Sequence, residues 1–349
     1  MEKKGTIDVD GSQKSGSGTI LRLSVALAAI TGQPLHIFNI RQNRPQHGLK
    51  HQHLEAVLTV ARLCGASVQG ASLGSQELWF TPQKVVGGSV EAEIETAGSI
   101  PMLLLASLPV CLYADQPVHL HVAHGGTDTT HAPTINYMRC VLLPTLRKMG
   151  VTAEISVTKY GYYPKGGGEA NMTVQPNHSL KSIRLESFGK IKEVKGISIC
   201  TSLADRQVAD RQRKAAQNHL AQAGFRSRID VVNDQSNSYQ KGSSIVLWAE
   251  TDSGVVVGAD AIGQLGKMAE EVGKEAAEKL LAELVTQATT DMFLADMLIP
   301  YMALAGGKSA MLCRKITEHV ESNIWLIEKM LNITFRVQKV SNLYRIETS

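Results

Sequence analysis

The sequence has little of what marks a secreted, zinc-binding or membrane-spanning protein. It contains five scattered cysteines and no CxxC pair, so neither a disulfide framework nor a zinc site of the usual spacing is predicted. The apolar segment 101–114 is too short to span a bilayer, and the opening MEKKGTIDVDGS has no apolar signal core. These absences predict a soluble, cytoplasmic protein with no membrane contact, whose thiols are reduced and mostly buried. The cysteines are Cys64, Cys111, Cys140, Cys200 and Cys313.

Charge of one sign is also scarce. The formal net charge is +4 over 349 residues, which permits a polyanionic partner without requiring one. With 43% hydrophobic residues the chain can bury a sizeable core. The length exceeds that of a usual single domain, so we expect either one large domain with an insertion or two domains.

Strand-like and helix-like segments alternate along the chain. A strand pattern in LHIFNIR (35–41) precedes a helical pattern in 49–65, and units of similar size recur up to Pro176. Within them, TINYMRCVLLPTLRKMG (134–150) predicts one helix, and 152–176 predicts a hairpin around a glycine-rich bend. The pattern predicts an internally repeated α+β fold.

The composition changes after Pro176. Charged helices and short strands follow, and an apolar pattern returns near residue 290. We predict a large domain in two parts, residues 1–184 and 286–349, with a small inserted α/β domain at 185–285 between them.

Three glycine-rich segments are candidates for phosphate loops. Segment 10–22 places Gly11, Gly16 and Gly18 between a strand and a helix, where backbone N–H groups could hold a phosphate or form a plain turn. Segment 161–170 lies between strands and favours a structural hairpin. Segment 258–269 lacks the residues of a nucleotide loop and is rejected as one.

The segment IRQNRPQHGLKHQH (40–53) is rich in basic residues and contains no acidic one. The guanidinium groups of Arg41 and Arg44 match phosphate oxygens in geometry and stay charged near neutral pH. A solvated basic loop would have the same composition. Arg22, in the neighbouring glycine turn, favours a phosphate site if the first two strands are adjacent.

Six segments, taken in order, resemble those of the RNA 3′-terminal phosphate cyclases. They are VDGSQKSGSGTILR, IRQNRPQHGLKHQHLEAV, AGS, GGTD, GYYPKGGGEA and FLADMLIPYMALA, and they span nearly the whole chain. The resemblance implies a large domain of repeated units, each with two helices on a four-stranded sheet, and a small inserted α/β domain.

The resemblance also implies a ligase reaction that uses ATP, Mg²⁺ or Mn²⁺, and RNA with a 3′-phosphate end. A histidine takes AMP from ATP and passes it to the RNA 3′-phosphate, giving RNA–ppA, and the adjacent 2′-hydroxyl then closes a 2′,3′-cyclic phosphate. By its position, His319 corresponds to the nucleophile, and neutral imidazole suits that role near pH 7.

Other family roles transfer to matching positions in the same way. Arg22, Arg41 and Arg44 correspond to phosphate-binding arginines, and Gln52 to a polar active-site residue. Asp296 corresponds to an acidic residue near the nucleotide sugar and the nucleophile. Phe293 and Pro133 correspond to the residues on either face of the adenine. From its helical pattern alone, Phe293 would instead be a core aromatic residue.

The chain departs from the family at three positions. Ser15 stands where most cyclases have a metal-binding glutamate, and serine is a poorer ligand for a hard cation. Leu105 and Met297 are apolar where the family is polar. No metal ligand is therefore identified, and two alternatives stay open: a divergent subgroup with altered metal handling, or a relative that has lost some of the activity.

Two other functions remain open from the sequence. One is a non-catalytic cyclase-like protein of ribosome assembly, against which His319 argues because such relatives lack the nucleophile. The other is a small-molecule enolpyruvyl transferase, which has a related architecture but different motifs. The sequence does not predict the physiological RNA or the oligomeric state.

Overall fold

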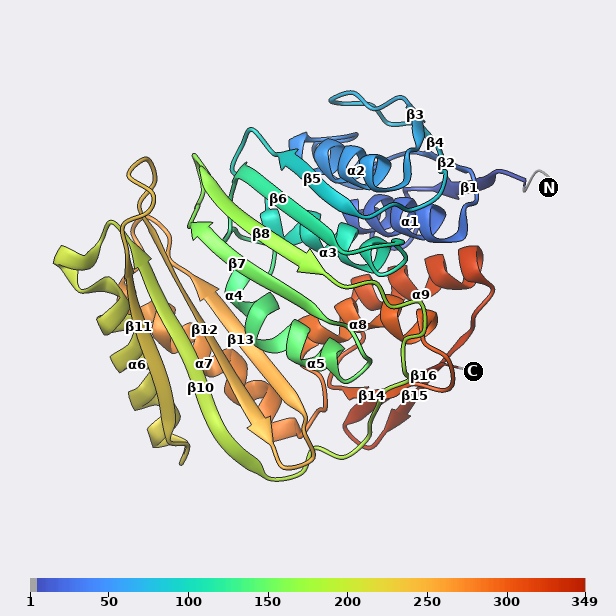
Figure 1. Cartoon of the computed structure of the whole chain (residues 1–349). Helices are drawn as coiled ribbons and strands as arrows, with labels where there is room; N and C mark the ends of the chain where they lie inside the picture. The colour runs from blue at the N-terminus through green and yellow to red at the C-terminus, as the bar shows by residue number, and fades with distance from the viewer. Residues whose placement is uncertain (1–4, 349) are drawn as a thin grey trace.

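In the computed structural model, which describes residues 5–348, the chain forms four four-stranded sheets with helices packed against them (Figure 1). Residues 7–81 build the first, which we call unit 1. Its strands follow the order β1-β2-β4-β3; β1 and β2 are parallel, and β4 is antiparallel to both of its neighbours. The elements are β1 (Ile7–Asp10), α1 (Gly18–Thr31), β2 (Leu35–Phe38), α2 (His51–Cys64), β3 (Ser67–Gln69) and β4 (Leu78–Thr81).

Residues 88–174 form unit 2 with the same topology. Its strand order is β5-β6-β8-β7, again with one parallel pair followed by two antiparallel pairs. The elements are β5 (Gly88–Glu93), α3 (Ile100–Cys111), β6 (Val118–Gly125), α4 (Ile135–Tyr137), a π-helical turn (Met138–Leu142), α5 (Leu143–Arg147), β7 (Ala153–Lys159) and β8 (Gly168–Val174). The predicted hairpin around the glycine-rich bend is confirmed as β7 and β8.

The single helix predicted over 134–150 is wrong in detail, because the structure breaks it into α4, the π-helical turn and α5. Pro144 has no N–H to donate to the carbonyl of Cys140, and its ring crowds that carbonyl. In the π-helical turn, Leu143 N–H instead bonds to the carbonyl of Met138, five residues earlier. The proline therefore accounts for the local change of helix type.

Unit 3 is made from two separate stretches of chain. Its first strand is β9 (Arg184–Leu185), and its other elements begin only at residue 292. The order β15-β16-β14-β9 repeats the pairing of units 1 and 2. The later elements are α8 (Met292–Leu304), β14 (Ala310–Cys313), α9 (Glu318–Leu331), β15 (Phe335–Val340) and β16 (Leu343–Thr348).

Residues 191–286, which we call the inserted segment, lie between β9 and α8. They form a sheet of order β11-β10-β12-β13 covered by α6 and α7. The elements are β10 (Ile191–Thr201), a 3₁₀ turn (Ala204–Arg206), α6 (Val208–Gln222), β11 (Ser227–Asp234), β12 (Gly242–Thr251), β13 (Val256–Ile262) and α7 (Ala269–Thr286). The predicted fold class, repeated α+β units with an inserted α/β layer, is confirmed.

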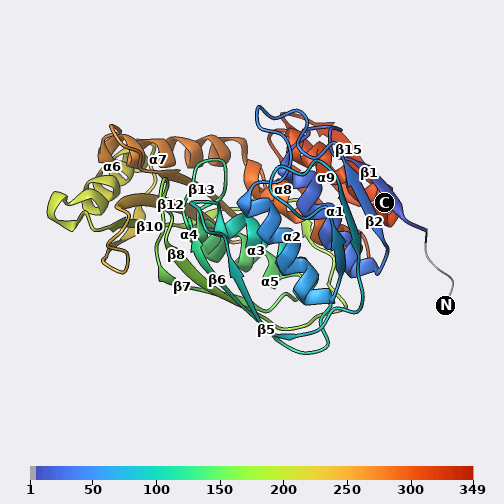
Figure 2. The same ribbon diagram turned by 90° about the horizontal axis from the view of Figure 1, so that it is seen from above.

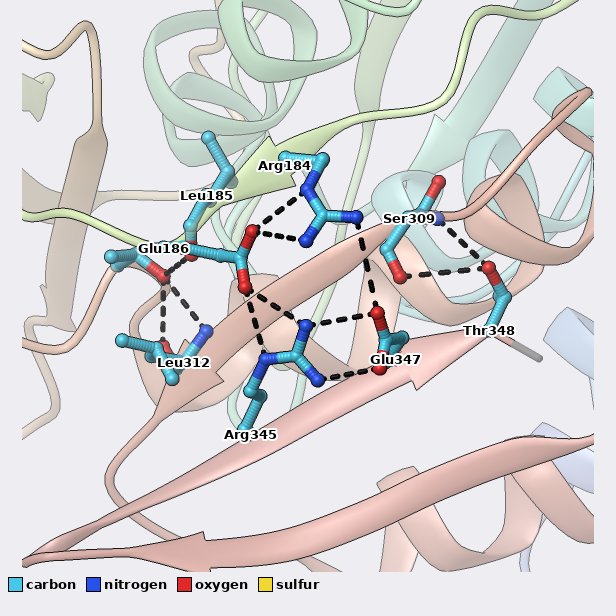
Figure 3. A network of polar contacts seen from close by, with 9 residues as sticks. Arg184, Leu185, Glu186, Ser309, Leu312, Arg345, Glu347 and Thr348 are labelled. Atoms are coloured by element: carbon cyan, nitrogen blue, oxygen red, sulfur yellow. Dashed lines mark hydrogen bonds and ion pairs between the residues drawn. The ribbon is translucent and has the colours of Figure 1, made fainter.

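A charged network closes unit 3 where the chain leaves it. Glu186, directly after β9, accepts hydrogen bonds from Arg184 and Arg345. Arg345 also pairs with Glu347 in β16 (Figure 3). These contacts link the two-residue strand β9 to β16, the strand on the other side of β14.

The helices of the three units meet at the centre of the molecule. Figure 2 shows α1, α2, α3, α8 and α9 gathered between the sheets, and these helices contact one another across unit boundaries. All five cysteines are unpaired, and all but Cys140 are buried. The centre of the fold is therefore built from helices of different units.

Candidate active site

A pocket of about 430 Å³ lies where α1, α3 and α8 converge, a volume within the usual range of small-molecule sites. These are the first helices of units 1, 2 and 3. Each turns the same set of positions toward the pocket, spaced i, i+3, i+4 and i+7, which share one face of a helix. The residues are Thr19, Arg22, Leu23 and Ala26 in α1, Met102, Leu105, Ala106 and Pro109 in α3, and Phe293, Asp296, Met297 and Pro300 in α8.

One end of the pocket is formed by the beginnings of α1 and α9. The Ser17 side chain accepts from the Thr19 N–H at the start of α1, and the Thr317 hydroxyl accepts from the Val320 N–H at the start of α9. Thr19 Oγ1 lies 3.3 Å from Nδ1 of His319. Two helix N-termini, which favour negative charge, therefore meet beside His319.

Three arginines gather at this end of the pocket. Arg22 and Arg41 are both buried, and Arg41 donates to the carbonyl of Gly48 at 2.8 Å. Burial, together with the charge of Arg41, lowers the pKa of Arg22 to about 10; burial and Arg44 lower the pKa of Arg41. No acidic side chain within residues 5–348 pairs with any of the three. Buried, unneutralised guanidinium groups favour the binding of an anionic ligand.

His53 belongs to the same cluster and was missed by the sequence analysis. Its ring is 4% exposed, and burial together with Arg22, Arg41 and Lys50 lowers its pKa to about 2, so it is neutral. Its Nδ1 accepts from the Lys50 N–H at 3.4 Å, which leaves the proton on Nε2. The one available signal was its place in the first turn of a helix that directly follows the basic segment.

Gly18 makes this arrangement possible. A Cβ atom at position 18 would lie 2.2 Å from His53 Nε2 and 2.9 Å from Arg22 Nη1. The first residue of α1 is therefore a glycine because two polar side chains occupy the space where a side chain would be.

His319 lines the pocket from the first turn of α9. Burial lowers its pKa most, and Arg22 and Arg44 lower it further against the opposing effect of Glu318. The imidazole is therefore neutral at pH 7. In the tautomer that donates from Nδ1 to Thr19, the lone pair lies on Nε2. Such a group is a competent nucleophile.

Phe293, Pro133 and Asp296 line the same pocket. Phe293 is 38% exposed, so the interpretation as a core aromatic residue is wrong. Asp296 accepts a short hydrogen bond from the Thr317 hydroxyl, two residues before His319. Burial raises the pKa of Asp296 to about 7. An aromatic ring, a proline and a carboxyl group thus lie in one cavity with His319.

Gln52 and Ser15 lie next to the site without lining the pocket. Gln52 Oε1 accepts from the Ser99 N–H at 2.8 Å, at the beginning of α3. Ser15 is buried; its Oγ lies 3.0 Å from Ser17 Oγ and 2.8 Å from Ser322 Oγ in α9. Gln52 therefore links unit 1 to unit 2, and Ser15 links the first glycine turn to the helix that carries His319.

No group of three or more His, Cys, Asp or Glu side chains in the described part of the chain could hold a metal ion. Within residues 5–348 no helix combines the length and apolar composition that crossing a bilayer requires. The predicted site residues Arg22, Pro133, Phe293, Asp296 and His319 share one pocket. Arg41 and Arg44 join them through the charge cluster around Arg22 and His319.

This arrangement suits transfer of a phosphorus group. A neutral imidazole can attack phosphorus, guanidinium groups can stabilise the charge on its oxygens, and a partly apolar cavity can hold a nucleoside. Neither a thiol nor a serine paired with a histidine base lines the pocket among residues 5–348.

Comparisons with known proteins agree with this chemistry. The model of the family "RNA 3'-terminal phosphate cyclase" matches residues 13–337. Proteins named RNA 3'-terminal phosphate cyclase are similar over nearly the full chain. One from Pyrococcus furiosus is 43% identical over 332 residues, which cover 95% of each chain. One from Pyrobaculum neutrophilum is 41% identical over 341 residues, covering 98% of this chain and 97% of its own. One from Methanosarcina barkeri is 40% identical over 346 residues, covering 98% and 100%. The chain belongs to the RNA 3′-terminal phosphate cyclase family.

Proposed function

We propose that this member of the RNA 3′-terminal phosphate cyclase family converts an RNA 3′-terminal phosphate into a 2′,3′-cyclic phosphate, and ATP into AMP and pyrophosphate. The observation that carries the proposal is the neutral His319 beside Arg22, a buried arginine that has no acidic partner within residues 5–348. This combination provides a nucleophile and, next to it, a place for its anionic substrate.

In the first step, Nε2 of His319 attacks the α-phosphorus of ATP. The bond from that phosphorus to the bridging oxygen breaks, and pyrophosphate leaves. Arg22, Arg41 and Arg44 hold the phosphates and stabilise the charge that develops on their oxygens. His53 Nε2–H, which faces Arg22 and the start of α1, supplies a further neutral donor.

In the second step, an oxygen of the RNA 3′-phosphate attacks the histidyl-AMP. The P–N bond breaks, which returns the imidazole and forms RNA–ppA. In the third step the adjacent 2′-hydroxyl attacks the 3′-phosphorus, AMP leaves, and the hydroxyl proton passes to water. The cyclic phosphate is closed without further ATP.

The other site residues are proposed to hold the nucleotide. Phe293 and Pro133 pack on the two faces of adenine, and Asp296 accepts hydrogen bonds from the ribose. Gln52 positions the beginning of α3. Residues 5–348 contain no group of three or more His, Cys, Asp or Glu side chains that could hold a metal ion by itself. Mg²⁺ or Mn²⁺ would therefore be held mainly by ATP oxygens and water, with its charge neutralising the leaving pyrophosphate.

Transfer of labelled AMP tests the proposal. Purified protein incubated with α-³²P-ATP and Mn²⁺ should gain an acid-labile label, and the His319→Ala variant should gain none. His219→Ala, in α6 of the inserted segment, is the matched control and should label like the wild type. Equal labelling of His319→Ala and the wild type would disprove the assignment.

The same experiment decides between the alternatives. A non-catalytic relative would neither take up AMP nor cyclise RNA with a 3′-phosphate. An enolpyruvyl transferase has no support from the family match. The predicted domain limits, 1–184, 185–285 and 286–349, and the predicted location in the cytoplasm stay predictions.

A further inference from the structure

Two tyrosine rings stand out on the surface. Tyr163 is 75% exposed and Tyr239 is 77% exposed, more than any other Phe, Trp or Tyr in residues 5–348. Tyr163 lies in the glycine-rich bend between β7 and β8, and Tyr239 in the loop between β11 and β12 of the inserted segment. Exposure on this scale gives the fold little packing energy.

The two loops that carry the rings are joined to each other. Asn237 Nδ2 donates to the carbonyls of Tyr160 and Gly166, at 2.8 and 3.1 Å. The Lys165 N–H donates to Gln240 Oε1 at 3.3 Å. Figure 1 shows the β11–β12 loop beside the bend that joins β7 to β8. The tyrosines therefore flank a junction held by hydrogen bonds.

The neighbouring tyrosine shows that packing does not require Tyr163. Tyr162 is 3% exposed and packs against Gly242, where a Cβ atom would lie 2.1 Å from its ring. Its hydroxyl accepts from Thr201 at 3.3 Å. Tyr162 thus makes the contact with the inserted segment, and Tyr163 is left facing solvent.

Positive charge accompanies the two rings. Lys165 and Lys241 are exposed, and neither has an acidic partner in residues 5–348. Asp234, the last residue of β11, accepts hydrogen bonds from Thr201 and Ser236 instead. We name Tyr163, Lys165, Tyr239 and Lys241 together the aromatic-basic patch.

The patch is close to the pocket. Thr127 N–H donates to the carbonyl of Gly161 at 2.8 Å, and Asp128 forms a β-bridge with Tyr162. A few residues later the same loop lines the pocket with residues 130–133. One short loop therefore contacts the bend that carries the patch and also forms part of the pocket wall.

We propose that the aromatic-basic patch binds the single-stranded RNA that precedes the 3′ end, while the pocket holds the terminal phosphate. Bases stack on exposed aromatic rings whatever their sequence, and lysines near the rings pair with the backbone phosphates. The inference rests on the proposed function and adds a second contact for the same substrate. It assigns a role to the glycine-rich bend that no catalytic step uses.

The test compares long and short 3′-phosphorylated RNA. Binding of a fluorescent single strand of about 15 nucleotides, the upper end of known single-strand site sizes, is measured by anisotropy. Tyr163→Ala/Tyr239→Ala should raise its dissociation constant about tenfold or more. Binding of a 3′-phosphorylated dinucleotide and labelling by ATP should not change. Tyr163→Phe/Tyr239→Phe should bind like the wild type, and so should Trp79→Ala, which removes an exposed ring on unit 1.

The contribution of Lys165 and Lys241 is tested by measuring how RNA affinity depends on salt concentration. Lys165→Gln/Lys241→Gln should reduce the slope of log affinity against log salt by about 0.7 for each RNA phosphate that a lysine no longer neutralises. Lys339→Gln, on β15, is the control and should leave the slope unchanged.

Three results would contradict the proposal that the patch binds RNA. They are no binding of the long strand by the wild type, unchanged binding of the long strand by the double alanine variant, or a weakening of dinucleotide binding in that variant equal to that of the long strand. The proposed function can fail separately. If RNA binding depends on the patch but the protein takes up no AMP, the proposed cyclase function is wrong and the patch proposal stands. If the protein cyclises RNA but binding does not depend on the patch, the patch proposal is wrong and the proposed function stands.

Discussion

Helices α1 and α3 occupy the same place in units 1 and 2, yet they bring opposite chemistry to the pocket. Both turn positions i, i+3, i+4 and i+7 toward it. At the second of these positions α1 has Arg22 and α3 has Leu105. The equivalent position of α8, in unit 3, is Asp296. The repeated fold thus supplies three equivalent places, and single side chains make them cationic, apolar and acidic.

Helices α1 and α3 also differ in how they affect the stability of the fold. Arg22 is 8% exposed and beside other cations, which lowers its pKa. A buried charge without a partner destabilises the protein, whereas Leu105 packs against the apolar core. The buried charge of Arg22 therefore lowers the stability of α1, and under the proposed function it serves phosphate binding, whereas α3 contributes an apolar side of the pocket.

Arg22→Leu gives α1 the residue type that α3 has at the equivalent position, and we expect it to have the largest effect of the substitutions considered. Arg22→Leu removes charge-assisted hydrogen bonds worth roughly 1.5–3 kcal/mol, so AMP labelling should fall about 10- to 150-fold. The melting temperature should rise, because an unpaired buried charge is removed. Labelling rates and thermal melts measure the two effects. Leu105→Met, the matched control in α3, should label within about twofold of the wild type; unchanged labelling of Arg22→Leu would refute the assigned role.

Asp296→Asn tests the acidic position of α8. At pH 8 the ATP concentration for half-maximal labelling should rise about five- to tenfold, because a hydrogen bond to a neutral amide is weaker than one to a carboxylate. The pKa of Asp296 is raised to about 7, so the wild-type carboxyl group takes up a proton as the pH falls below 7. The gap between the two proteins should therefore close toward pH 6.

The raised pKa of Asp296 also determines whether the stability of the protein rises or falls with pH. The native state holds this proton up to about pH 7 and the unfolded state loses it near pH 4, so the wild type loses stability as the pH rises between these values. Asp296→Asn has no such loss and should melt higher than the wild type at pH 8. A constant difference in melting temperature between pH 4 and pH 8 would show that Asp296 does not titrate in this range.

Ser15→Glu, in the turn before α1, should have the smallest effect. A carboxylate that leaves the contact with Ser322 and turns toward the phosphates could share in holding Mn²⁺. The half-saturating Mn²⁺ concentration for labelling should fall about two- to threefold, equivalent to a weak net contact of roughly 0.5 kcal/mol. Titration of Mn²⁺ against the labelling rate measures this. Ser15→Ala is the control without a carboxylate, and coincident curves for Ser15→Glu and Ser15→Ala would place position 15 away from the ion.

Much of the fold could be predicted from local patterns. Apolar spacing located α2, and the recurrence of strand and helix patterns of similar size indicated the repeat. The break at residues 138–142 was missed, because a proline inside an otherwise helical pattern can either kink or divide a helix. The pairing of β9 with β14 was beyond local reasoning, since more than a hundred residues separate the two strands.

The site was less accessible from residue patterns alone. The basic segment and the glycine turn pointed to an anion at Arg22, Arg41 and Arg44, but His319 and Phe293 came from the family resemblance. A histidine at the start of an amphipathic helix has no distinguishing local signal, and its contact with Thr19 depends on how unit 3 packs on unit 1. His53 was missed because its contacts with Gly18 and Arg22 depend on how α2 packs on α1. The roles assigned to these residues stay predictions.

The contact between Thr19 and His319 joins positions 300 residues apart, and this separation has a consequence during synthesis of the chain. The ribosome makes the arginines of unit 1 first, then the whole inserted segment, and only afterwards Phe293, Asp296 and His319. A nascent chain released before residue 319 has the cations of unit 1 without His319. If His319 is the nucleophile, as we propose, translation products that end before residue 319 are inert in the adenylylation step, whatever part of them has folded.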